Sequence, residues 1–382
     1  MKPTVFLIRN IAPECYGGGE SYQIELAKVL KKKGYRPIIF TASKKLLKNA
    51  KDEKIETVKA PYLKMQNWSS WRNLLLPIYY VWQIKLKKWY KGQIKKYNPV
   101  LLNVQSRDEL IGATLAGVKC KKRVIWTDHA DFRTWSLVNV NVKVKNQIGK
   151  WILRCGKKVY RIILINDYER EFFEKLVYPR TFSNLEVIKN GVLDEYEKYK
   201  NIKPRPRSFC FVGRIVEDKG IKELLLAFLK VLEKYPNSQL NLYGEGEDFE
   251  KFKPLVKDKQ RIIFHGYVKE PLKILSENEI FILPSYHEGL SLSLLEAAMM
   301  EKKIIASDIA GNKEVIQNKK TGILVPVKKP QSLAEAMIYM LENRSDADKM
   351  AKNVRNYYKQ NFDLERIFDD KMNMLYKVEK NE

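Results

Sequence analysis

The chain has 382 residues, a formal net charge of +26 and a hydrophobic content of 45%. This length is too great for one ordinary core and predicts two domains, while the hydrophobic content is sufficient for folding without a partner. Four scattered cysteines and three histidines show no metal-ligand spacing. They argue against a structural metal and favour reduced cysteines in a cytosolic protein.

The positive charge is concentrated in the first half of the chain. Residues 1–200 hold 40 Lys and Arg against 18 Asp and Glu, which is +22 of the total +26. This asymmetry indicates an anionic partner for that half, which could be membrane lipid, nucleic acid or an acidic acceptor. The longest apolar run, 74–84, is too short to cross a bilayer.

Strand and helix patterns alternate through the first half. Residues 1–11 predict a first buried strand, at 5–8, rather than a signal peptide. A Gly-rich turn follows, and an amphipathic helix over 20–33 ends at Gly34. Further strands are predicted at 38–41, 100–104, 124–127 and 162–165. This rhythm predicts a doubly wound parallel sheet.

Two features of this half fall at strand ends, where ligands bind in such sheets. Gly17, Gly18 and Gly19 follow the first strand and allow close approach of the backbone to a ligand. They do not form the GxGxxG pattern, which weakens an NAD interpretation. His129 follows the strand at 124–127, with Asp131 nearby. A lone histidine is more often structural, but its position at the strand end favours a binding role.

The segment 63–99 combines aromatic and basic residues. Its tryptophans are Trp68, Trp71, Trp82 and Trp89, and its last lysines are Lys85, Lys87, Lys88, Lys91, Lys95 and Lys96. A basic, aromatic, amphipathic helix suits an anionic membrane surface. The same mixture could bind nucleic acid, or form a core helix with a solvated lysine face. The charge bias of this half favours the membrane.

A Pro-rich, charged stretch at 201–207 predicts a linker, after which the alternation restarts. A helix is predicted over 221–235. Strands are predicted at 208–212, 239–243, 261–265, 279–283 and 303–306. The chain therefore predicts two Rossmann-like α/β domains facing a central cleft.

Basic residues surround the first strand-to-helix turn of the second half. Gly213 and Arg214 end the strand at 208–212, and Lys219 and Gly220 open the next helix. Two cations at such a turn can neutralise charge that develops on a leaving diphosphate. An ordinary surface pair is the alternative, but the flanking glycines favour the functional interpretation.

Two glutamates follow the strand at 279–283. Glu288 falls in a loop with Gly289, and Glu296 lies eight residues on, inside a helix predicted to start near Ser291. The amides and dipole of a helix N-terminus favour phosphate, and carboxylates accept hydrogen bonds from sugar and ribose hydroxyls. A solvated helix face would look similar, but the combination predicts a nucleotide-sugar site.

Taken in order, these motifs resemble those of the retaining GT-B glycosyltransferases, glycosyltransferase family 4 (glycosyl transferases group 1). The pattern from Glu288 to Glu296 resembles the family signature, and Asn190-Gly-Val192 resembles a further motif before the linker. The family usually has Asp next, whereas this chain has Leu193 and then Asp194. The match spans nearly the whole chain.

The resemblance implies domains at 1–200 (acceptor side) and 201–356 (nucleotide-sugar side), with a helix within 357–382 crossing back. Arg214 and Lys219 would bind the donor diphosphate, while His129 would contact the donor sugar. Glu288 would bind sugar hydroxyls and complete the catalytic set. The other donor-binding residues would be Gly18, Gly19, Gly213, Tyr267, Gly289, Leu290, Ser291, Leu292 and Glu296.

The sequence thus predicts a retaining, metal-independent hexosyltransferase without a cofactor. It would use UDP- or GDP-hexose and a glycan or lipid-linked acceptor in cell-surface polysaccharide or glycolipid synthesis. It would work in the cytoplasm, peripheral on the inner face of the cell membrane, without binding nucleic acid. One alternative is a sugar-nucleotide epimerase or hydrolase on a similar scaffold. The other is a non-catalytic protein that binds membrane or nucleic acid, which would leave the Arg, Lys and Glu motifs unexplained.

Overall fold

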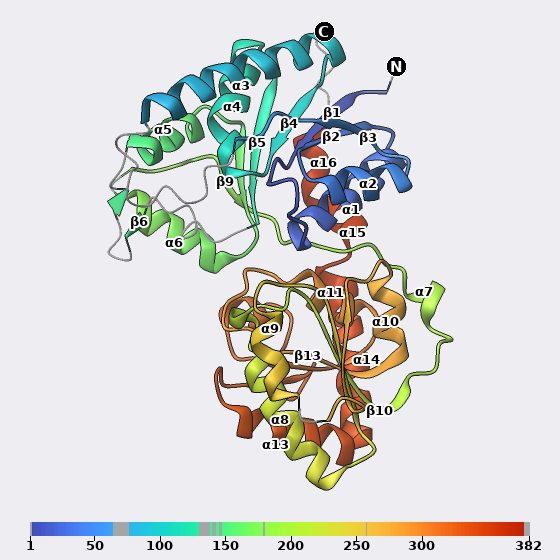
Figure 1. The fold of residues 1–382 in the computed structure, drawn as a ribbon. Helices are drawn as coiled ribbons and strands as arrows, with labels where there is room; N and C mark the ends of the chain where they lie inside the picture. Colours follow the sequence, from blue (N-terminus) through green and yellow to red (C-terminus); the bar gives the residue numbers. More distant parts are fainter. Residues whose placement is uncertain are drawn as a thin grey trace. The chain divides into compact units, whose positions relative to one another are not determined.

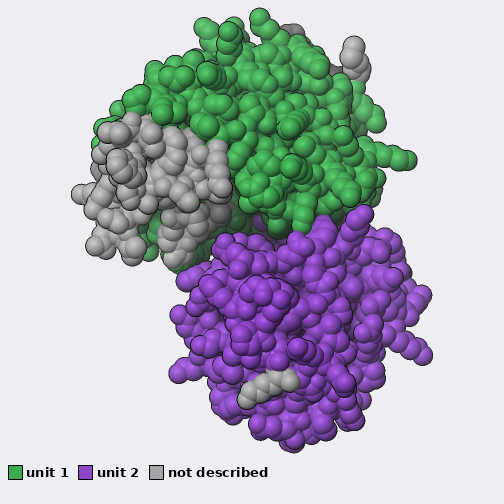
Figure 2. All heavy atoms as spheres, in the orientation of Figure 1, with its two compact units in different colours: residues 1–189, 365–382 green, residues 190–364 purple. Residues whose placement is uncertain are grey.

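The computed structural model describes residues 2–63, 76–129, 138–139, 143–144, 147–178, 180–256 and 258–377 (Figure 1). The chain divides into two compact units (Figure 2). Unit 1 comprises Met1–Lys189 and Glu365–Glu382, and unit 2 comprises Asn190–Leu364. The boundary predicted after residue 200 therefore falls inside unit 2.

Unit 1 is built on a seven-stranded sheet whose strands all pair in parallel. In spatial order the strands are β3 (Glu56–Lys59), β2 (Arg36–Thr41), β1 (Thr4–Ile8), β4 (Leu101–Val104), β5 (Arg123–Asp128), β8 (Arg161–Leu164) and β9 (Leu185–Val187). The helices are α1 (Gly18–Lys32), α2 (Lys44–Asp52), α3 (Leu76–Tyr97), α4 (Leu110–Lys119), α5 (Gln147–Gly156) and α6 (Asp167–Val177). A short antiparallel pair joins β6 (Val138–Asn139) and β7 (Lys143–Val144). The strand order reverses between β1 and β4, which is the switch point of a Rossmann-like sheet.

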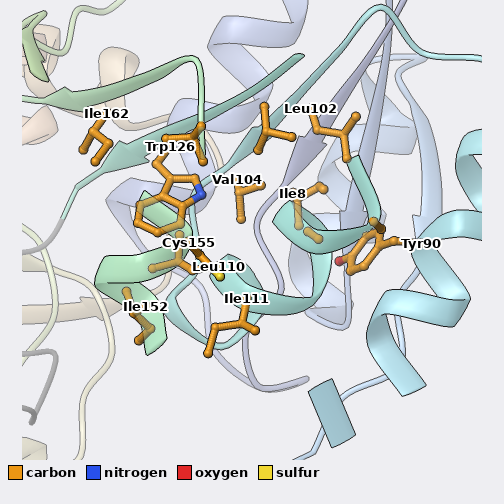
Figure 3. Packing of buried hydrophobic residues seen from close by; sticks show 14 of the residues in the cluster. Ile8, Tyr90, Leu102, Val104, Leu110, Ile111, Trp126, Ile152, Cys155 and Ile162 are labelled. Carbon is orange, nitrogen blue, oxygen red and sulfur yellow. The ribbon is translucent and has the colours of Figure 1, made fainter. Parts of the chain in front are cut away.

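One face of this sheet carries the main core of unit 1. Alternate strand residues such as Ile8, Val104 and Trp126 pack there against α3, α4 and α5 (Figure 3). Trp126 Nε1 also donates to Thr114 Oγ1 at 2.8 Å, which satisfies the one polar atom of this large buried ring. The carboxyl ends of β4 and β5 are therefore held by packing just beneath the residues that follow them.

The opposite face is covered in part by the end of the chain. The elements of this segment are α15 (Leu364–Ile367), a π-helical turn (Phe368–Met372) and α16 (Asn373–Tyr376), in place of the single helix expected within 357–382. Tyr376 is buried, and its hydroxyl accepts from Asn103 Nδ2 at 2.9 Å. The break in the predicted helix has a tertiary cause, because Phe362 O accepts from Val192 N and Asp363 forms a β-bridge with Val192.

Unit 2 contains a six-stranded, all-parallel sheet with the same order of connection. In spatial order the strands are β12 (Ile262–Gly266), β11 (Gln239–Tyr243), β10 (Arg205–Val212), β13 (Asn278–Leu283), β14 (Lys303–Ser307) and β15 (Ile323–Val325). The helices are α7 (Tyr196–Tyr199), α8 (Ile221–Lys234), α9 (Phe249–Phe252), α10 (Pro271–Glu277), α11 (Leu292–Met299), α12 (Ala310–Lys313), α13 (Pro330–Glu342) and α14 (Arg344–Asn361). The switch point lies between β10 and β13. The predicted fold class, two Rossmann-like α/β domains, is confirmed.

The linker predicted at 201–207 overlaps the start of β10. The register of β10 against β13 shifts between Arg205 and Phe209, and Arg207 has a φ of 57°. Prolines are tolerated at such a strand start or bulge because no ladder hydrogen bond is needed there. The Pro-rich composition that suggested a linker therefore marks an irregular strand beginning.

Candidate functional site

The switch point of unit 1 is closed by polar contacts between the residues that follow β1 and β4. Arg9 Nη1 donates to Gln105 O at 2.7 Å, and Asn10 N donates to Ser106 Oγ at 3.0 Å. Arg9 Nε also donates to Glu20 Oε1 at 2.7 Å, which neutralises a buried carboxylate in the first turn of α1. Ligands bind at this position in doubly wound sheets, and here the two strand ends are joined by hydrogen bonds.

The glycines predicted to bind the donor begin α1. Gly17 is the N-cap, and Gly18 and Gly19 lie in the first turn, where backbone amides lack intrahelical partners. A side chain at Gly19 would place its Cβ 2.5 Å from Arg9 Nη2, so a larger residue there would have to displace the end of the Arg9 side chain. The loop therefore presents amides beside the Arg9–Glu20 pair.

His129 lies directly after β5, as predicted. Its Nε2 is 2.5 Å from Gln105 Oε1, and its ring packs 4.7 Å from the ring of Tyr22. Burial raises the pKa of the Tyr22 hydroxyl, which therefore stays neutral. Asp131, whose role was left open, lies outside the described residues.

In unit 2, Lys219 and Glu288 come together across 69 residues of sequence. Lys219 Nζ donates to Glu288 Oε1 at 2.8 Å, and the two side chains are 14% and 13% exposed. Lys219 ends a 3-10 turn (Glu217–Lys219), and Gly220 follows with a φ of +68°. A Cβ at Gly220 would lie 2.2 Å from Pro284 O, so glycine allows this turn to touch the loop that carries Glu288.

The loop that carries Glu288 is held by Tyr286. Its hydroxyl donates to Glu223 Oε2 at 2.6 Å, and its backbone N–H donates to Asp218 O at 2.8 Å. Burial and the Glu223 carboxylate raise the pKa of Tyr286. These contacts anchor the loop to α8 and the preceding turn. Tyr286 lies two residues before Glu288 and is not among the residues that the sequence motifs predict.

Helix α11 begins beside this loop as predicted. Ser291 is its N-cap, and its Oγ accepts from Leu294 N at 3.4 Å. Leu290, Ser291 and Leu292 are buried, so what they can offer a ligand is backbone amides rather than side chains. Glu296 lies further along the helix and is half-buried.

The remaining predicted residues lie at neighbouring strand ends. Gly213 and Arg214 follow β10, and Gly213 N donates to Tyr243 O at 3.0 Å. Arg214 is exposed. Tyr267 follows β12 and is 38% exposed.

The part of the chain that the structure describes holds neither a metal-ligand cluster nor a membrane-spanning helix. No group of three or more His, Cys, Asp or Glu residues there is arranged to hold a metal ion. Within the same ranges, no helix has the length and apolar character needed to span a bilayer.

Two Rossmann-like units, each with polar groups at its switch point, define the GT-B class of fold. The family described as Glycosyltransferase Family 4 matches residues 16–196, and that described as Glycosyl transferases group 1 matches residues 193–357. The chain belongs to these glycosyltransferases, which confirms the predicted family.

Individual proteins agree with this assignment. The chain is 28% identical over 277 residues to the UDP-Gal:alpha-D-GlcNAc-diphosphoundecaprenol alpha-1,3-galactosyltransferase of Escherichia coli, covering 68% of this chain and 69% of that protein. A glycosyltransferase structure from Rickettsia africae matches all of both chains with a TM-score of 0.78 and 21% identity. Anabaena HepE, solved with UDP-glucose, has a TM-score of 0.77 and 15% identity, over 98% of this chain and 100% of that one. The structural similarities show the fold.

Proposed function

We propose that this glycosyltransferase moves a hexose from a nucleoside diphosphate sugar to a hydroxyl of a glycan or lipid-linked acceptor, with retention of configuration. The observation that carries the proposal is the Lys219–Glu288 pair at the switch point of unit 2, beside the N-terminus of α11. These groups match a sugar diphosphate. The cation and the helix amides can bind the charged phosphate oxygens, and the carboxylate can accept hydrogen bonds from the sugar hydroxyls.

The proposed mechanism begins with exchange of partners. The donor diphosphate takes over Lys219 and recruits the exposed Arg214, while the amides near Leu290–Leu292 bind phosphate oxygens. Glu288, relieved of Lys219, accepts hydrogen bonds from the hexose hydroxyls, and Glu296 accepts from the ribose. In unit 1, His129 contacts the donor sugar, and the Gly18–Gly19 amides bind its phosphate.

Bond cleavage follows from this charge distribution. The bond between the anomeric carbon and the phosphate oxygen breaks, and the acceptor oxygen bonds to that carbon. Lys219 and Arg214 stabilise the charge that collects on the leaving nucleoside diphosphate. The leaving phosphate oxygen takes the acceptor proton, so the proposal needs no covalent enzyme intermediate and no metal ion. EDTA is therefore expected to leave the transfer rate unchanged; restoration by Mn²⁺ or Mg²⁺ after a loss would refute the metal-free step.

The proposal is tested by incubating the chain with a panel of UDP- and GDP-hexoses, with and without glycan and lipid-linked acceptors. A glycoside with the anomeric configuration of the donor, seen by NMR only when acceptor is present, is the expected result. An inverted product contradicts retention. Free hexose or an epimerised nucleotide sugar as the sole product, even with acceptors present, would favour the hydrolase or epimerase alternative.

We also propose that the protein binds the anionic inner face of the cell membrane through α3. Ile78, Tyr80, Val81 and Ile84 are each 50–55% exposed on the first half of this helix, and Lys85, Lys88, Lys95 and Lys96 are exposed on the second half. Exposed apolar side chains followed by lysines on one outer face suit an interfacial helix. This placement would present a lipid-linked acceptor to the enzyme.

The outward residues of α3 differ from those emphasised by composition. Trp82 and Trp89 pack partly against the core of unit 1. Trp68 and Trp71 lie outside the described residues. On the described helix, the exposed apolar patch therefore consists of Tyr80 and three aliphatic residues rather than of tryptophans.

A further inference from the structure

His129 is held by a chain of buried amides that begins at the Gly-rich loop. Gln23 Nε2 lies 3.3 Å from Gly19 O and also contacts Gln105 Oε1, which in turn lies 2.5 Å from His129 Nε2. Both glutamines are buried. Neither family resemblance nor the motifs of the sequence assign them a function.

The polarity of this chain is determined at one end. A backbone carbonyl can only accept, so the Gln23 amide must turn its NH₂ group toward Gly19 O. That NH₂ group also faces Gln105, which must therefore present its oxygen. An oxygen facing the imidazole requires a donor, so the ring nitrogen Nε2 of His129 must carry a proton.

We propose that Gln23 and Gln105 form a relay that holds a proton on Nε2 of His129, with Gln105 as the positioning residue. The relay joins the backbone of the Gly-rich loop to the tautomer of the histidine, and Tyr22 limits the ring from its side. The catalytic consequence of this tautomer rests on the proposed function, in which His129 contacts the donor sugar.

The relay is braced by Arg9. The same guanidinium binds Glu20 beside the glycines and the backbone carbonyl of Gln105, at 2.7 Å in each case. Gly19 and Gln105 are therefore linked twice, once through the Gln23 side chain and once through Arg9. Because the amide of Gln105 is neutral, it orients the imidazole ring through a hydrogen bond without placing a charge beside it.

The first test measures the tautomer directly. Ring ¹⁵N–¹H correlation spectra of histidine-labelled protein separate Nε2–H from Nδ1–H forms, and a His129→Gln variant assigns the signal. Wild type is expected to show Nε2–H. Gln105→Met and Gln23→Met should give a mixture of forms, whereas Gln105→Glu should retain Nε2–H because it keeps an oxygen toward the ring.

A matched control is available in the same unit. Gln83 is equally buried, accepts from Gly112 N at 2.9 Å and donates to Asp108 O at 3.0 Å. Gln83→Met should cost comparable stability and leave the His129 spectrum unchanged. Nδ1–H in wild type, or a Gln105→Met spectrum identical to wild type, overturns the relay.

The second test links the relay to transfer. Gln105→Met should lower kcat about tenfold or more while the donor Kd changes by less than about twofold, because the ring is misplaced but the phosphate contacts are intact. Gln105→Glu should recover most of the rate. If the spectra behave as expected but His129→Gln transfers normally, the assigned role of His129 fails and the relay stands. If only the spectra fail, the relay is wrong and the proposed transferase function is unaffected.

Discussion

At the scale of single residues, Lys219 and Glu288 form an ion pair in which each side chain neutralises the charge of the other. Each side chain is mostly buried, and each would be an isolated charge without the other. Replacing one partner leaves the other as an uncompensated buried charge, which destabilises the fold. Replacing both partners with neutral residues leaves no such charge.

This reasoning gives a double-mutant prediction. Lys219→Met should destabilise unit 2 by about 1–3 kcal/mol, and adding Glu288→Gln should return part of that loss. Urea unfolding of the two singles and the double measures the coupling free energy. Additive effects would show that the pair contributes nothing to stability.

The same lysine should matter far more for turnover. Lys219→Met is expected to lower kcat about 10²–10³-fold, because a positioned cation acts on charge formed in the transition state. Lys222→Met, an exposed change three residues along on α8, is the matched control and should retain the wild-type rate. Equal rates for the two variants would remove Lys219 from the chemistry.

A second residue-scale feature is Glu109, a fully buried carboxyl in unit 1. Asn10 Nδ2 donates to its Oε1 at 2.8 Å, but burial raises the pKa of Glu109 to about 7 from an ordinary 4.5. Between pH 4.5 and 7 the folded state binds more protons than the unfolded state. The free energy of unfolding therefore falls as pH rises through this window.

Glu109→Gln should remove that dependence. The free energy of unfolding of the variant, relative to that of wild type, is expected to rise by on the order of 1–3 kcal/mol between pH 4.5 and pH 8. Glu14→Gln, at an exposed position, should show no such gain. Parallel stability profiles for wild type and Glu109→Gln would mean that Glu109 is ionised in the folded state.

At the scale of elements, helix α3 has two distinct halves on its outer face. If the lysine half binds anionic lipid, Lys85→Gln with Lys88→Gln should lower the partition coefficient on anionic vesicles roughly 30-fold, since each lysine contributes about 1 kcal/mol. Lys349→Gln with Lys352→Gln, exposed on α14 of unit 2, is the matched control. Vesicle flotation at low and high salt makes the measurement.

The aliphatic half of α3 should behave differently. Val81→Ser with Ile84→Ser is expected to weaken binding by a similar factor at both salt concentrations, because apolar insertion is not screened. Binding that is unaffected by either pair of changes, or equal on neutral and anionic vesicles, would exclude α3 as the membrane surface.

Elements also show what a single sequence can reveal. The alternation of apolar runs and amphipathic segments was enough to predict β1, β10, β13 and the start of α11, because periodicity and capping are local signals. The first three residues of β10, 205–207, are read as linker from composition, because the prolines there belong to an irregular strand start. The single helix expected within 357–382 is interrupted near Asp363, because the bridge of Asp363 to Val192 joins residues far apart in the sequence and leaves no local signal.

The same distinction separates the predicted from the unpredicted parts of the site. His129, Lys219 and Glu288 were named because they follow strands in recognisable motifs. The Gln105–His129 contact and the Lys219–Glu288 pair each join residues that follow two neighbouring strands of a sheet. The strands are separated in the sequence, so the sequence around one partner does not predict the other. Buried glutamines have no motif at all.

At the scale of the whole molecule, unit 1 depends on a segment supplied from beyond unit 2. Phe368, Met372, Leu375 and Tyr376 are buried in unit 1. Ending the chain after Leu364 should therefore destabilise unit 1 while leaving unit 2 folded. The milder Tyr376→Phe, which leaves Asn103 Nδ2 without its 2.9 Å partner, should cost about 1–3 kcal/mol.

The composition provides a probe for this prediction. All seven tryptophans lie between residues 68 and 151, so tryptophan emission reports on unit 1, whereas circular dichroism reports on both units. In the truncated chain, the unfolding transition seen by tryptophan emission should shift to a lower urea concentration. A second transition, from unit 2, should remain in circular dichroism. Coincident, unchanged transitions for truncated and full chains would show that the final segment adds nothing to unit 1.

The same arrangement sets an order of events during translation. Unit 2 is one continuous stretch, so it can fold as soon as Leu364 has left the ribosome. Unit 1 begins first yet finishes last, because its missing piece is synthesised only after the whole of unit 2. Until Tyr376 emerges, the nascent chain carries one finished unit and one sheet with an uncovered face. That interval is when a ribosome-associated chaperone would be needed, and it is unit 1 that such a chaperone would hold.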